Sequence, residues 1–80
     1  MILTAGDSFT YGDELTNRTE SAWPYLIAQR MGVDCQNVAE PGGSNDTAVR
    51  LIVEHTVRQQ FDLVIMGWTL PERFETWNEL

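Results

Sequence analysis

Short apolar runs alternate with helical stretches along this chain, and that alternation limits its possible folds more than any other feature. The clearest run is Leu63-Val64-Ile65-Met66, which follows Asp62 and ends at Gly67. A continuous apolar run of this length is typical of a parallel strand covered on both faces. A second run, at residues 1–5, ends in the same way at Gly6. Both runs predict strands of an α/β domain.

The first predicted helix covers residues 22–31. Its apolar positions recur at helical spacing: Trp23, Leu26, Ile27 and Met31. Thr19 or Ser21 is expected to cap its start, with Pro24 in the first turn, where a missing N–H costs nothing. Gly32 follows as the C-terminal stop.

A second predicted strand, residues 35–38, leads through a Gly42-Gly43 turn into a second helix. Ser44 or Asn45 is expected to cap this helix, which runs to about residue 60. Apolar residues spread around much of its circumference, so we expect more than one face to be covered. They are Ala48, Val49, Leu51, Ile52, Val53 and Val57.

The order strand, helix, strand, helix, strand predicts two right-handed crossovers and one parallel sheet. With the first strand in the centre, the sheet order is 2-1-3 and the helices fall on opposite faces. Ligands bind such sheets at the carboxyl ends of the strands, where the chain reverses direction. We therefore expect Ser8, the Gly42-Gly43 turn and the stretch Gly67-Trp68-Thr69 to meet on one rim.

Length and charge restrict the classes of function. Eighty residues make one small domain, 1–80, of marginal stability. A net charge of −7, with five arginines and no lysine, argues against nucleic acid or anionic membrane as a partner. The chain has no apolar run long enough to span a membrane and no basic flank of a signal peptide, so a cytoplasmic location is expected by default.

Cys35 is the only cysteine in the sequence. An intrachain disulfide is therefore excluded, and a thiolate metal cluster would have to be intermolecular. Cys35 is expected to fill the core. The sequence indicates no cofactor and no metal site.

Ser8 is the candidate for chemistry on the rim. In one interpretation Asp7 and Ser8 only cap the turn after the first strand. In the other, Ser8 is a nucleophile, and its own N–H and that of Gly42 or Gly43 donate to a developing oxyanion. A nucleophilic serine also needs a base, usually a histidine. The only histidine, His55, falls late in the second helix, near the opposite edge of the sheet.

Three stretches carry a specific pattern: Ile2-Leu-Thr-Ala-Gly6-Asp7-Ser8-Phe-Thr-Tyr-Gly12, then Asn37-Val-Ala-Glu-Pro-Gly42-Gly-Ser-Asn45, then Phe61-Asp-Leu-Val-Ile-Met-Gly67. In this order they resemble the first three blocks of the SGNH (GDSL) hydrolase family. The resemblance implies a flavodoxin-like three-layer α/β/α sandwich, truncated relative to the full family fold. It also implies hydrolysis of esters, including lipid esters and acetyl groups on sugars. The form Gly-Trp-Thr-x-Pro-x-Arg-Phe-Glu, residues 67–75, resembles a branch encoded by bacteriophages.

The resemblance implies roles for the matching residues. Ser8 corresponds to the nucleophile, and its N–H to one oxyanion donor. Gly42 corresponds to the second donor. Thr69 stands where the family has an asparagine whose side chain donates a hydrogen bond, and its hydroxyl is a shorter donor than an amide. The matching residues that shape the turns are Gly6, Asp7, Gly43 and Gly67.

The family's Asp-x-x-His block, which supplies the base, matches nothing after Gly67. We expect either the N-terminal part of such a hydrolase or a shortened relative without its own triad. If the chain stops at Leu80, the strand at 63–66 is an exposed apolar edge. We therefore expect self-association through that edge or through residues 68–80, a loop followed by a short amphipathic helix or an extended arm.

Two functions of different classes follow. The first is a serine esterase that acts through Ser8 on a small ester or acylated sugar, with incomplete machinery in this chain. The second is an inactive binding or structural module that holds a small ester, sugar or anion through Gly42, Gly43 and the start of the second helix. Nucleotide binding has little support, because the sequence has no Gly-Lys-Ser/Thr and the rim is acidic.

Overall fold

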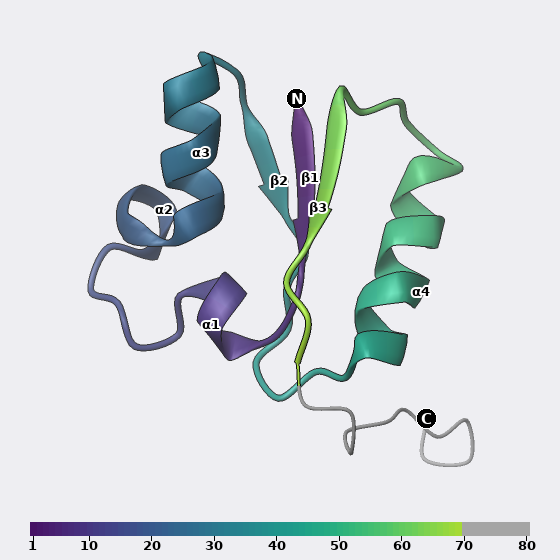
Figure 1. The fold of residues 1–80 in the computed structure, drawn as a ribbon, viewed down its shortest axis with the longest axis horizontal. Helices are drawn as coiled ribbons and strands as arrows, with labels where there is room; N and C mark the ends of the chain where they lie inside the picture. The colour runs from purple at the N-terminus through teal and green to yellow at the C-terminus, as the bar shows by residue number, and fades with distance from the viewer. Residues whose placement is uncertain (70–80) are drawn as a thin grey trace.

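The computed structural model describes residues 1–69, which form a three-stranded parallel sheet with helices on both sides (Figure 1). The strands are β1 (Ile2–Ala5), β2 (Cys35–Asn37) and β3 (Leu63–Met66), in the order β2-β1-β3. The helix α3 (Trp23–Met31) lies on one side of the sheet and α4 (Asn45–Thr56) on the other (Figure 1). The predicted α/β arrangement and the strand order 2-1-3 are confirmed.

The central strand β1 is the core of the domain. All four of its residues are fully buried, because β2 and β3 pair with it on either side. In register, Ile2 lies opposite Cys35 on β2 and opposite Leu63 on β3. The other buried apolar side chains among the described residues are Pro24 and four alanines: Ala22, Ala28, Ala39 and Ala48. A core made largely of alanines buries little area per residue, so each buried hydrogen bond carries a larger share of the stability.

The start of α3 differs from the prediction. Pro24 occupies the first turn and Gly32 ends the helix in the left-handed conformation, as expected. Neither Thr19 nor Ser21 caps it, because both belong to a separate short helix, α2 (Arg18–Ser21). The residue before α3 is Ala22, which makes no side-chain cap. Ala22 is buried in extended conformation, so packing rather than a cap sets the start of α3.

Ser44 caps α4, as one of the two predicted residues. Its Oγ accepts a hydrogen bond from the Thr47 N–H at 3.1 Å. The helix ends at Thr56 instead of about residue 60, because the backbone tightens there and the Arg58 N–H donates to the His55 carbonyl at 3.2 Å. The expectation that more than one face is covered is wrong for the described part of the chain. One side of α4 packs on β1, while the outer valines at 49, 53 and 57 are exposed.

Strand β3 is less covered than its apolar sequence predicted. Leu63 and Val64 are 40% and 39% exposed, because within residues 1–69 β3 pairs with β1 alone. Strand β2 ends one residue before the predicted boundary, although the Val38 N–H still donates to the Thr4 carbonyl. No helix among the described residues is long and apolar enough to cross a membrane. The expectation for residues 68–80 falls, from residue 70 onward, outside the described part.

Candidate functional site

Three connections meet at the carboxyl end of the sheet. The Glu40 N–H, from the connection after β2, donates to the Gly6 carbonyl after β1 at 3.1 Å. The Gly67 N–H, after β3, donates to the Ala5 carbonyl at 2.8 Å. The convergence predicted from topology is therefore present in the backbone.

Glycine permits this close approach. A Cβ on Gly6 would lie 2.8 Å from the Thr10 Cβ and 3.1 Å from the Gly67 carbonyl oxygen. A Cβ on Gly67 would lie 2.5 Å from the Thr10 Oγ1, and one on Gly43 would lie 2.9 Å from the Glu40 oxygen. Real Cβ atoms do not pack this closely, so a side chain at any of the three would push the connections apart.

Asn37, at the end of β2, joins the same connections through its side chain. Its Oδ1 accepts hydrogen bonds from the Thr4 hydroxyl at 3.1 Å and from the Ala39 N–H at 3.3 Å. Its Nδ2 donates to the Thr10 carbonyl in the helix α1 (Ser8–Tyr11) at 3.1 Å. One amide therefore ties together β1, β2 and the helix that carries Ser8. Asn37 lies in the second resembling block, but no local signal in the sequence marks it as the residue that joins these connections.

Ser8 is the first residue of α1, and Asp7 is its N-cap. The Asp7 Oδ1 accepts a hydrogen bond from the Phe9 N–H at 3.0 Å. Gly12 ends the helix in the left-handed conformation, and its N–H donates to the Ser8 carbonyl at 2.9 Å. This short helix is thus fixed at both ends, which holds Ser8, a half-buried residue, at the carboxyl end of β1.

A cleft of about 450 Å³ opens beside Ser8. It lies between α1, the loop that follows it and the first turn of α3. Besides Ser8, its wall includes the apolar residues Phe9, Leu15, Ala22, Trp23 and Leu26. The Trp23 Nε1 donates to the buried Thr10 Oγ1 at 3.3 Å, so the indole is oriented by the same threonine that packs against Gly6. The cleft has the size and largely apolar lining of small-molecule sites.

The predicted oxyanion residues lie on the two other connections. Gly42 is exposed and has a positive φ of 75°. The neighbouring Gly43 N–H donates to the Glu40 carbonyl at 2.9 Å and is therefore engaged within its own turn. Thr69 is held by Asn45 of α4 through two bonds: the Thr69 N–H donates to Oδ1 at 2.8 Å, and Nδ2 donates to the Thr69 carbonyl at 3.3 Å. Sequence reasoning named Asn45 only as a helix cap and missed this pairing.

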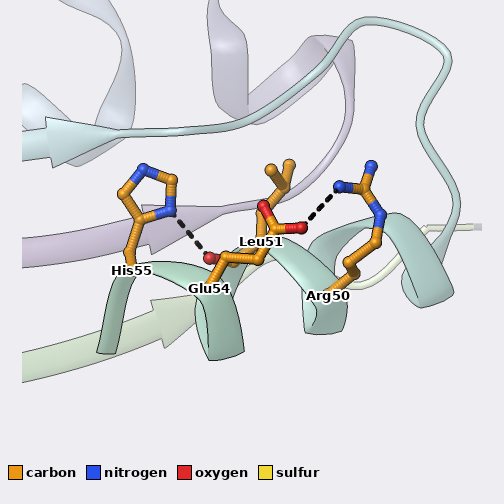
Figure 2. Close-up of polar contacts among 4 residues, drawn as sticks. All are labelled: Arg50, Leu51, Glu54 and His55. Carbon is orange, nitrogen blue, oxygen red and sulfur yellow. Dashed lines mark hydrogen bonds and ion pairs between the residues drawn. The ribbon is translucent and has the colours of Figure 1, made fainter. Parts of the chain in front are cut away.

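His55 does not belong to this site. It lies in the last turn of α4, while the first turn of that helix faces the rim (Figure 1). Figure 2 shows its Nδ1 turned to the Leu51 carbonyl of the same helix, at 2.8 Å. Beside it, Arg50 pairs with Glu54 at 3.2 Å. The histidine in this sequence therefore sits at the amino end of the sheet, as its position in the chain predicted.

Two groups with a shifted pKa, Cys35 and Asp62, lie away from the rim. Burial raises the pKa of the Cys35 thiol on β2, which lies beside the Thr4 hydroxyl of β1. The N-terminal ammonium of Met1, 2.6 Å from the Asp62 carboxylate, lowers the pKa of Asp62 at the amino end of β3. Among residues 1–69 no group of histidine, cysteine and carboxylate side chains is arranged to hold a metal ion.

Comparison of the chain with protein-family models, curated proteins and solved structures found no match.

Proposed function

We propose that this chain is an SGNH-type serine hydrolase module that acts on ester bonds through Ser8. The observation that carries the proposal is the meeting of three glycine-containing connections next to a serine that lines a cleft. These connections lie in the sequence blocks that resemble the family, so the resemblance and the geometry point to the same residues. The flavodoxin-like three-layer sandwich is part of the proposal, and the order β2-β1-β3 is compatible with it.

In the proposed reaction the Ser8 Oγ attacks the ester carbonyl carbon and passes its proton to a base. The negative charge that develops on the carbonyl oxygen is held by the Ser8 N–H, the Gly42 N–H and the Thr69 hydroxyl. Because the Gly43 N–H is engaged with Glu40, the assignment in that turn rests on Gly42. One such donor is worth roughly a hundred- to a thousandfold in rate. The intermediate then collapses, and the leaving alcohol takes the proton from the base. Water cleaves the acyl-enzyme, which releases the carboxylic acid and restores the Ser8 hydroxyl.

Residues 1–69 place no histidine at the rim to serve as the base. His55 lies at the other end of α4 and is bonded to its own helix, so it cannot accept the proton of Ser8. The proposal therefore assigns the base to a histidine of another polypeptide segment or chain that approaches the rim.

A second candidate function is a binding module without turnover, and the position of His55 favours it. In that case the same rim and cleft hold a small ester or sugar. Ser8 then has no chemical role and is only the first residue of α1. This candidate shares the binding geometry with the hydrolase and differs from it in the reactivity of Ser8.

Labelling with a fluorophosphonate probe separates the two functions. The probe forms an Oγ–P bond and releases fluoride, so it reports an activated serine. With imidazole added to stand in for the base, the hydrolase proposal expects labelling of the protein, none of Ser8→Ala and full labelling of Ser21→Ala, which changes a second serine lining the same cleft. Equal thermal unfolding of the variants shows that each is folded. Labelling that survives in Ser8→Ala, or its absence from the unchanged protein, refutes the hydrolase for this chain.

A further inference from the structure

Large apolar side chains in the cleft beside Ser8 remain exposed to solvent. Phe9 is 83% exposed and Leu26 is 46% exposed, although both line the same hollow. Apolar side chains gathered around a hollow mark a binding surface more often than scattered ones do. Trp23 supplies a rigid wall, because its indole N–H is bonded to the buried Thr10 hydroxyl.

The charges at this cleft have one sign. Asp13 and Glu14, from the loop after α1, line it, and of the described residues that line it none is basic. Arg18, on the neighbouring helix α2, is directed toward Tyr11. Its Nε donates to the Tyr11 carbonyl at 3.0 Å, and its guanidinium lies 3.7 Å from the Tyr11 ring centroid. An aromatic wall together with carboxylates favours a positive charge, while an anion meets repulsion.

We infer that this cleft is the subsite for the apolar substituent of the ester, and that it takes cationic or neutral groups and rejects anionic ones. The inference rests on the proposed function for the role of Ser8, but the binding itself does not require turnover. It identifies the substrates as esters whose acyl or alcohol group is apolar and carries no negative charge.

Three probes of one size test the inference: benzylammonium, benzyl alcohol and benzoate. Each is titrated into the ¹⁵N-labelled protein, and amide shifts are followed by NMR. We expect shifts at the cleft, with benzylammonium bound more tightly than the alcohol and benzoate most weakly. Two exposed carboxylates contribute roughly two- to fivefold each to this order. The titrations measure binding without turnover, so failed labelling of the unchanged protein together with intact binding removes the hydrolase alone.

Matched variants locate the site. Leu26 and Met31 lie on the same helix and are 46% and 48% exposed, but only Leu26 lines the cleft. Leu26→Ala should weaken binding of benzyl alcohol roughly three- to fivefold through lost apolar contact, and Met31→Ala should not. Glu14→Gln should reduce the preference for benzylammonium, whereas Glu20→Gln on α2 should leave it unchanged. Absent binding, shifts away from the cleft, or benzoate bound as tightly as benzylammonium would overturn the inference.

Discussion

Replacing Asn37 with alanine should lower the free energy of unfolding by about 3 kcal/mol. The side chain makes three hydrogen bonds, with the Thr4 hydroxyl, the Ala39 N–H and the Thr10 carbonyl. Each contributes about 1 kcal/mol net, and a buried partner left unsatisfied costs more. A domain of this size is stable by roughly 4–12 kcal/mol, so one substitution would remove a large part of the total.

The measurement is urea denaturation at neutral pH, followed by circular dichroism. The midpoint should fall while the slope stays constant, because the surface exposed on unfolding hardly changes. Gln36→Ala is the matched control, since this residue is the half-buried neighbour on the same strand. It should cost less than about 1 kcal/mol, as substitutions outside such networks usually do.

A double-mutant cycle tests the network itself. Thr4→Val removes the hydroxyl that donates to the Asn37 Oδ1 and keeps the shape of the buried side chain. The loss of unfolding free energy in the double variant should be smaller than the sum of the two single losses by about 1 kcal/mol. The reason is that the shared hydrogen bond is lost only once. A cost of Asn37→Ala below about 1 kcal/mol, or full additivity with Thr4→Val, would refute the reasoning.

Three further outcomes are expected. Gly6→Ala should destabilise the domain by about 2 kcal/mol or more, because the new Cβ would overlap the buried Thr10 of α1. Gly32→Ala should cost less, about 1–2 kcal/mol for its positive φ, because its Cβ would meet nothing within 4 Å. Thermal unfolding compares the two variants. Asn45→Ala should speed hydrogen exchange of the Thr69 amide about tenfold, because its acceptor at 2.8 Å is lost, and unchanged protection would contradict the pairing. The folded pKa of Asp62 lies below its unfolded value because of the N-terminal ammonium, so its contribution to stability is present above the unfolded pKa and is lost as the pH falls through the folded one. The stability of Asp62→Asn should therefore depend less on pH in the acid range than that of the unchanged protein. An NMR titration that shows no lowering of the Asp62 pKa would contradict this prediction.

The candidate site shows where sequence reasoning stops. The position of Ser8 after β1 and the meeting of three connections followed from the strand order, because parallel strands place their carboxyl ends on one edge. The residues that hold the connections together did not follow from it. Asn37 and Asn45 are polar residues next to turns, and nothing local distinguishes a turn former from a side chain that bonds a segment 24 or more residues away.

By itself, the sequence determined the elements that depend on local chemistry. The apolar run Leu63–Met66 became β3 with the predicted bounds, and Gly32 ended α3, because an apolar run and a left-handed cap are readable from neighbouring residues. The tertiary structure decided what depends on distant contacts. It placed the start of α3 at the buried Ala22, left the outer valines of α4 exposed, and oriented Trp23 through Thr10 to form one wall of the cleft beside Ser8. Periodicity shows that a face is apolar, but only the neighbours that reach that face decide whether it is buried.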